Sequence, residues 1–185
     1  MRTNRGQGKE INTTMDTLSI VTPKHPALHT PANIDPFTTD INWVEREQAM
    51  LQLMVDKFGI GLASPQVGES HNMFVMRHSL YGEIGVYNPE IVSYSEDNVT
   101  LEEGCLTFPL LFLNLTRPAS IDVRYYKNDG IMVEDTFTGM DSRCYQHEYE
   151  HLQGELFIDR ASNMKLQRAF TKREKLFKTL ERQVK

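Results

Sequence analysis

The segment Gln146–His151 holds two histidines and a carboxylate at a spacing that metal chemistry can use. On an α-helix, residues four positions apart lie on one face, so His147 and His151 can bind the same metal ion. Glu148 would then lie beside the ion, where a carboxylate can take a proton from metal-bound water. The pattern predicts a hydrolytic metal site. The plain alternative is a pair of histidines packed on an ordinary helix.

A cysteine supplies the third candidate ligand. Cys105 follows Gly104 in a segment between predicted strands. Its thiolate, with His147 and His151, would leave a fourth position of a tetrahedral ion open to water. Cys144 lies three and seven residues before the two histidines and therefore shares a helix face with them. All four side chains together would instead form a closed Cys2His2 shell, a structural metal site in a non-catalytic binding module.

A run of small residues, Gly59 to Gly68, contains a single amide side chain. Glycine lets a backbone approach a ligand closely, and the amide of Gln66 could donate a hydrogen bond to a developing oxyanion. An ordinary glycine-rich turn is the alternative interpretation.

Helices must position these groups, and two are predicted around them. The histidine helix should run from about Ser142 to Gln153, with Asp141 as its N-cap and Gly154 just past its end. Apolar residues at three- and four-residue spacing predict an earlier helix from Asp40 to Phe58. Asp40 is its expected cap, and Gly59 is expected to end it.

Short apolar or alternating segments predict the strands. They cover residues 19–22, 73–76, 84–87, 90–94, 100–103, 121–126 and 131–137. Asn88-Pro89 should end the third, and the fourth and fifth should pair around the polar turn at 95–98. Asn128-Asp129-Gly130 is the strongest hairpin signal in the chain. Strands without βαβ alternation predict an α+β fold, with mostly antiparallel sheets packed around the histidine helix and a C-terminal amphipathic helix.

Composition limits the class of protein. A chain of 185 residues with 39% hydrophobic and 24% charged residues has room for one well-buried core. No apolar run approaches the roughly 18 residues of a membrane span, and the polar start does not resemble a secretory signal. We therefore expect a cytoplasmic protein without a membrane partner. Both cysteines, Cys105 and Cys144, should be reduced.

The charge is unevenly distributed. Residues 161–185 carry a net charge of +6 in a chain whose net charge is −5, so the first 160 residues carry −11. The acidic body argues against DNA as a partner. A basic amphipathic helix is predicted over 163–185, and its apolar stripe is Leu166, Phe170, Phe177, Leu180 and Val184. The basic face would suit ribosomal RNA, and a merely solvated face is the alternative.

Three segments together resemble the motifs of the peptide deformylase family. They are Gly59–Gln66, Glu103–Thr107 and Gln146–His151, in that family's order and approximate spacing. The resemblance covers roughly residues 19–162 and implies a catalytic domain there. The residues before it, 1–18, are mostly polar without apolar periodicity and are expected to form a mobile tail. It implies an enzyme that removes the N-formyl group from the formyl-methionine of nascent polypeptides and releases formate.

The resemblance also implies roles for individual residues. The metal ligands would be Cys105, His147 and His151, normally holding Fe(II), with Zn(II), Ni(II) or Co(II) as alternatives. Glu148 would be the general acid/base, while Gln66 and the backbone N–H of Leu106 would hold the oxyanion. Gly61 would contact the substrate main chain. The methionine pocket would be bordered by Ile60, Glu103, Met140, Arg143 and Cys144.

Some residues depart from the family pattern. Ser64, Thr107 and Glu150 stand where the family usually has Ala, Ser and Asp. The segment 110–113 is more apolar than expected for the loop after the second motif, so the peptide preference should differ. A metallopeptidase is the enzymatic alternative, and its third ligand would come from Glu155 or Asp159 downstream of the histidines.

Overall fold

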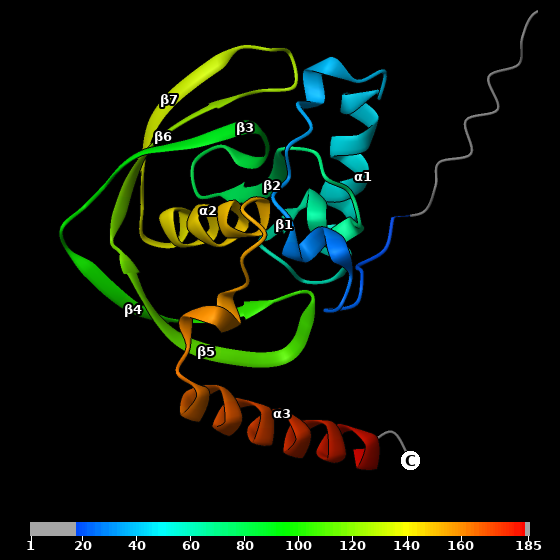
Figure 1. Ribbon diagram of the computed structural model, residues 1–185, viewed down its shortest axis with the longest axis vertical. Coiled ribbons are helices and arrows are strands. Elements are labelled where there is room, and N and C mark those ends of the chain that lie inside the picture. The colour runs from blue at the N-terminus through cyan, green and yellow to red at the C-terminus, as the bar shows by residue number, and fades with distance from the viewer. Residues whose placement is uncertain (1–17, 184–185) are drawn as a thin grey trace, which may run out of the picture.

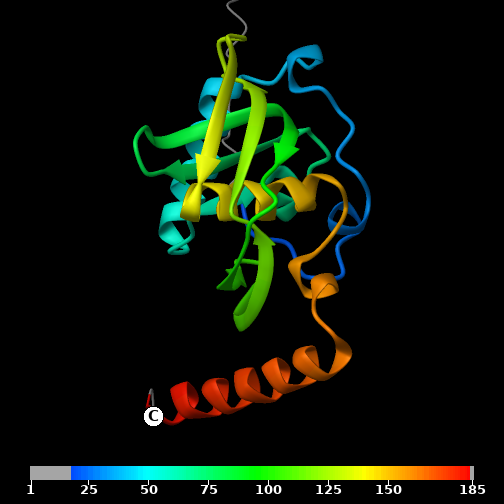
Figure 2. The same ribbon diagram turned by 90° about the vertical axis from the view of Figure 1, so that its left-hand side faces the viewer.

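The fold is built around one buried helix, α2 (Gly139–Leu152), which carries His147 and His151. The computed structural model describes residues 18–183, so the predicted tail lies outside the described residues except for Leu18. In both views α2 runs through the middle of the molecule, among the strands (Figure 1 and Figure 2).

An antiparallel sheet covers one side of α2. Within residues 18–183 its strand order is β1-β2-β3-β6-β7. The strands are β1 (Gly61–Ala63), β2 (Met73–His78), β3 (Gly82–Tyr94), β6 (Ser120–Tyr126) and β7 (Met132–Thr138). Side chains alternate between the two faces of a strand. Phe74 and Met76 therefore join the core around α2, while Met73 and Val75 join the core under α1 (Trp43–Asp56).

A separate antiparallel ribbon brings the predicted cysteine ligand to α2. It consists of β4 (Asn98–Cys105) and β5 (Phe108–Pro118). Leu111, Leu113 and Leu115 alternate inward from β5 and pack with Phe157, which begins a short 3-10 helix after α2. The pairing register shifts between Gly104 and Cys105. Such an irregularity bends a strand and re-aims the side chain beside it.

The predicted strand pairing was wrong in one region. Asn88-Pro89 does not end β3. Asn88 adopts a left-handed backbone (φ 46°), but the strand continues past it to Tyr94. Beyond this irregularity β3 pairs with β6, and β4 pairs with β5 instead of with residues 90–94. Residues 19–22 form no strand; Val21 only donates one backbone hydrogen bond to Gln66. The hairpin of β6 and β7 was predicted correctly.

Two predicted helix caps were also wrong. The side chain of Asn42, not Asp40, accepts the hydrogen bond at the start of α1. Helix α2 begins earlier than predicted, after Thr138, and Asp141 accepts hydrogen bonds from Ser79 across to the sheet. Gly154 does follow the end of α2 in the left-handed conformation (φ 75°), as predicted.

The C-terminal helix, α3 (Asn163–Gln183), lies along the β4–β5 ribbon and away from the main sheet (Figure 2). Leu166 and Phe170 pack against the ribbon core, whereas Phe177 and Leu180 stay 38% and 45% exposed. The predicted stripe therefore docks only in its first half, and Val184 lies outside the described residues. In the part of the chain that the structure describes, every helix is too short or too polar to cross a membrane.

Candidate metal and catalytic site

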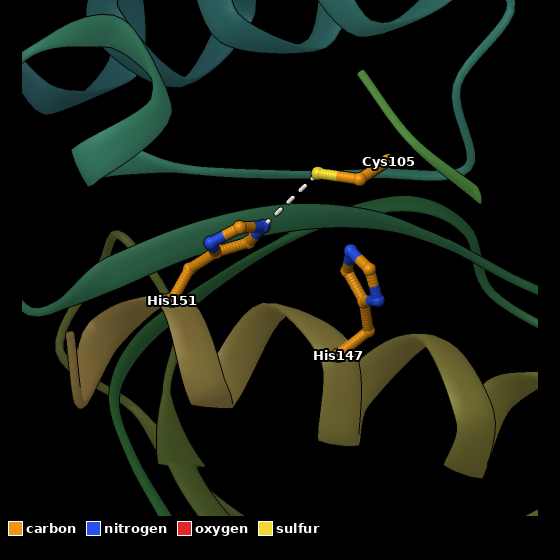
Figure 3. A group of neighbouring side chains, drawn as sticks. All are labelled: Cys105, His147 and His151. Atoms are coloured by element: carbon orange, nitrogen blue, oxygen red, sulfur yellow. Dashed lines mark hydrogen bonds between the residues drawn. The ribbon is translucent and has the colours of Figure 1, made fainter. Parts of the chain in front are cut away.

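Three predicted ligands meet at the centre of the molecule. Among the described residues, Cys105, His147 and His151 form a buried group whose candidate ligand atoms all lie within 4.8 Å of one another. Nε2 of His151 lies 3.3 Å from Sγ of Cys105. The two imidazoles rise from successive turns of α2 toward the thiol, which enters from the ribbon (Figure 3). This arrangement follows from the four-residue spacing on α2 and the register shift that precedes Cys105.

A buried charge network orients His147. Its Nδ1 lies 3.0 Å from Oε2 of Glu103, so its other ring nitrogen is left for the site. Arg117 donates two hydrogen bonds to Glu103, and Arg143 donates a third. Burial alone would raise the pKa of Glu103, but the bonds from Arg117, His147 and Arg143 outweigh burial and hold this pKa well below its usual range. Glu103 is therefore an ionised carboxylate.

The surroundings shift the pKa values of the two histidines in opposite directions. Burial, with the nearby His147 and Arg117, lowers the pKa of His151 well below its usual value, which favours the neutral imidazole that binds metals. Burial also disfavours the charged form of His147, but the contacts with Cys105 and Glu103 outweigh it and raise that pKa. Loading an ion would therefore displace a proton from this group.

Glu148 is buried beside the ligands. Burial raises its pKa to about 7, the range in which a carboxylate can both take and return a proton near neutrality. Its Oε2 has no hydrogen-bond partner among the described residues. A Cβ atom on Gly61 would lie 2.3 Å from the other oxygen, Oε1. Only glycine at position 61 lets β1 approach the carboxylate this closely.

The single amide of the glycine run is also brought to the site. Oε1 of Gln66 accepts a hydrogen bond from the Ala63 backbone at 2.8 Å, which fixes the side-chain orientation. Its Nε2 therefore faces the site and lies 3.4 Å from Sγ of Cys105 and 3.3 Å from Oγ1 of Thr107. Leu106 lies between these two residues, in the turn from β4 to β5.

A cavity of about 520 Å³ opens onto these groups. It is lined by all the predicted pocket residues, namely Ile60, Gly61, Glu103, Met140, Arg143 and Cys144. Ile60 and Met140 are 44% and 53% exposed and lie at its edge. Glu103 and Arg143 are bonded to each other inside its wall, so their charged groups are already occupied.

The structure separates Cys144 from the ligand group. Its thiol donates a hydrogen bond to the Ile60 carbonyl at 3.2 Å, and burial raises its pKa well above the usual value. The described ligand group contains Cys105 and the histidines but not Cys144, so the closed Cys2His2 shell is wrong. Asp159, a third ligand in the peptidase alternative, instead accepts a hydrogen bond from the Leu156 backbone. Within residues 18–183 both cysteines are free, as predicted.

Arg117 is a part of the site that was not predicted from the sequence. This side chain is fully buried and joins Glu103 to Glu150, which Arg160 also contacts. A signal was present, because Arg117 continues the inward alternation of Leu111, Leu113 and Leu115 on β5. A charged residue at a core position of a strand indicates a buried ionic partner.

Comparisons with known proteins agree with this geometry. The family model described as polypeptide deformylase matches residues 17–167. A peptide deformylase of Thermotoga petrophila is 41% identical over 126 residues, covering 68% of this chain and 76% of that protein. The crystal structure of peptide deformylase from Thermotoga maritima superposes with a TM-score of 0.72 at 37% identity, over 79% of this chain and 98% of that one. One from Legionella pneumophila gives a TM-score of 0.78 at 32% identity, over 89% and 96%.

Proposed function

The chain belongs to the polypeptide deformylase family, and from that premise we propose that it hydrolyses the N-formyl group of formyl-methionyl peptides to formate and a free amine. The observation that carries the proposal is the group of Cys105, His147 and His151, with candidate ligand atoms within 4.8 Å of one another and Glu148 beside them. The catalytic domain would span residues 19–162, with α3 as an addition to it.

The donor set fits one divalent transition-metal ion. A thiolate and two imidazoles suit Fe(II), which we propose as the ion, and also Zn(II), Ni(II) and Co(II). The fit is supported by the pairing of His147 Nδ1 with Glu103, the arrangement that fixes a ligating imidazole. When bound, such an ion lowers the pKa of water and polarises a carbonyl oxygen.

The chain's own residues would divide the remaining work. Glu148 would take a proton from the attacking water and return it to the leaving amine. Nε2 of Gln66 and the backbone N–H of Leu106 would hold the negative charge that develops on the formyl oxygen. The edge strand β1 would align the substrate main chain at Gly61, and Ile60 and Met140 would border the methionine side chain.

Replacing Glu148 tests this division. Glu148→Ala should retain the ion and lose about 10²- to 10⁴-fold in turnover, because the residue acts on the proton and not on the ion. Formate release from formyl-Met-Ala-Ser and metal content by mass spectrometry measure the two effects. Glu96→Ala removes the same charge from an exposed residue outside the cavity and should change neither. Loss of the ion from Glu148→Ala would make Glu148 a ligand and overturn the mechanism.

We further propose that the exposed face of α3 binds ribosomal RNA. Its exposed basic residues include Lys165, Arg168, Lys172, Lys175 and Lys178. Replacing all five by Gln should weaken co-sedimentation with ribosomes and flatten its salt dependence, while turnover of a free formyl tripeptide stays unchanged. Glu174→Gln with Glu181→Gln, on the same helix, should strengthen it. If neither set of replacements changes co-sedimentation, these charges only keep the face of α3 solvated and do not bind RNA.

A further inference from the structure

Two bulky residues of the cavity adopt a backbone conformation that is costly for them. Among residues 18–183, the non-glycine residues with positive φ are Phe58 (59°), Asn88 (46°) and Leu110 (63°). Asparagine tolerates this region, whereas a large apolar side chain there is strained. Phe58 and Leu110 both line the cavity in front of Glu148. We call these two residues the apolar rim.

Phe58 is held in this conformation by the end of α1. Its N–H bonds the carbonyl of Val55, and the next residue, Gly59, bonds that of Met54. This pair of bonds ends many helices, and glycine normally occupies the position that Phe58 holds. In this chain the glycine, Gly59, comes one residue after that position. The residue with the left-handed backbone is therefore the aromatic Phe58. Its side chain is 96% exposed.

Leu110 is held in its conformation by contacts of its two neighbours in the chain, Pro109 and Leu111. It follows Pro109, whose carbonyl accepts a hydrogen bond at 2.7 Å from Nε of Arg173 on α3. The next residue, Leu111, is fully buried in the ribbon core and anchors the strand. The backbone on both sides of Leu110 is therefore fixed, and the half-buried side chain is directed to the cavity wall.

The position of the rim identifies its occupant. The cavity runs from the buried groups that would act on the formyl group to an edge where Phe58 is almost fully exposed. A peptide whose formyl-methionine lies at the buried end must pass its following residues over this edge. An exposed aromatic side chain loses unfavourable contact with water only when an apolar group covers it.

We propose that Phe58 and Leu110 form a specificity rim for the side chains that follow methionine, and that this enzyme therefore favours formyl-Met peptides with large apolar residues there. The proposal rests on the proposed function. The exposed charged residues of the cavity lining are Lys57 and Glu102, whose opposite charges give no preference for a charged peptide. Selectivity would come from apolar contact, which grows with the area removed from water.

A substrate series tests the rim. Formyl-Met-Leu-Ser, formyl-Met-Ala-Ser and formyl-Met-Asp-Ser place different side chains after methionine, and formyl-Met-Ala-Leu against formyl-Met-Ala-Asp moves the comparison one residue on. We expect kcat/KM for a Leu peptide to exceed that for its Asp counterpart by about tenfold at one or both positions, mainly through KM. Phe58→Asn with Leu110→Asn should reduce that ratio to about threefold or less, because asparagine accepts positive φ but removes the apolar surface.

Controls separate the possible failures. Leu80→Asn removes an 81% exposed leucine outside the cavity and should leave the ratio intact. Each single variant, checked by circular dichroism, replaces the double variant if that fails to fold. Turnover of the Ala peptide with no Leu over Asp preference, or a preference that survives in the double variant, would overturn the rim while the proposed function stands. No formate from any peptide with a fully loaded enzyme would overturn both.

Discussion

Two helices of this protein make opposite use of polar residues. In α2, ten of 14 residues are buried, among them Arg143, His147, Glu148 and Glu150. In α3, none of the 21 described residues is buried, although its apolar and basic residues are clearly segregated. Amphipathic pattern therefore does not measure burial in this chain. The partners available to each helix decide it.

The partners of α2 come from the β4–β5 ribbon. Arg117 reaches both Glu103 and Glu150, and Glu103 in turn reaches His147. Buried charges are tolerated only when they are paired and hydrogen-bonded, and here most of them are. The same bonds tie a candidate metal ligand to the strand that carries Cys105. Within residues 18–183, α3 makes one polar contact with another element, the bond from Arg173 to Pro109.

Breaking the network at Arg117 should have the largest effect. Arg117→Met fills similar space but leaves Glu103 and Glu150 buried without their common partner, so we expect a loss of about 3–5 kcal/mol in the free energy of unfolding. Urea titration monitored by circular dichroism measures it. Metal affinity should fall as well, because outer partners of a ligating histidine typically contribute ~10- to 100-fold.

Arg124 offers a matched control for that experiment. It also contacts two carboxylates, Glu90 and Glu134, but it is 40% exposed on the surface of the sheet. Arg124→Met should cost about 0–1 kcal/mol, because water solvates the groups that it leaves behind. Equal losses of unfolding free energy from the two variants would show that burial does not set the value of these ion pairs. The buried partners of α2 would then not explain why α2 differs from α3.

The second prediction concerns the closest approach to α2. Gly61→Ala places a methyl group 2.3 Å from Oε1 of Glu148 and 2.8 Å from Sγ of Cys144, so the carboxylate must move. We expect kcat to fall by about 10²-fold with the metal content unchanged, since small displacements of a catalytic group cost that much. Adding Gly61→Ala to Glu148→Ala should cost little more. An equal further loss in the double variant would place the effect of Gly61 elsewhere.

The sequence was enough for the central geometry and not for the strand partners. The four-residue spacing of His147 and His151 requires one helix face, so local rules sufficed for this pair, while the resemblance to a known family pointed to Cys105. The β4–β5 hairpin was missed because residues 110–113 were expected to form a loop, although the two strands are neighbours in the chain. The pairing of β3 with β6 joins segments distant in the chain and depends on an irregularity at Asn88. Arg117 was missed for the same reason, because its value lies in partners 14 and 33 residues away.

Helix caps were missed for a different reason. Asp40 and Asn42 are both good capping residues, so capping preference alone does not choose between them. The helix begins directly before the buried Trp43, with Asn42 as its cap. Asp141 resembles a cap, but it accepts a hydrogen bond from the backbone of Ser79, just after β2. Several local solutions of similar free energy were open, and tertiary contacts selected one of them.

The third prediction divides α3 into two halves. Phe170 packs on the ribbon core, whereas Phe177 is 38% exposed and lies under the guanidinium of Arg173. Phe170→Ala should cost about 2 kcal/mol of unfolding free energy, below the range for a fully buried phenylalanine, and Phe177→Ala less than about 1 kcal/mol. Thermal unfolding of both variants measures the difference. Similar losses would show that the whole stripe is docked in solution.

The prediction with the smallest expected effect tests whether α3 influences the active site. Arg173 donates to the carbonyl of Pro109, the residue before Leu110, and so fixes one wall of the cavity. Arg173→Met keeps a side chain of similar length but removes this bond, together with the guanidinium that lies over the Phe177 ring. We expect KM for formyl-Met-Leu-Ser to rise about threefold with kcat unchanged, because the wall positions the peptide and takes no part in the chemistry.

Two further variants show whether the hydrogen bond or the charge is responsible. Arg173→Lys retains a donor that can reach the same carbonyl and should restore most of the affinity. Arg168→Met removes a charge from the exposed face of α3 and should leave KM unchanged. If Arg168→Met raises KM as much as Arg173→Met does, the effect is one of net charge on the helix. The bond to Pro109 would then be incidental, and α3 would differ from α2 in having no connection to the reaction.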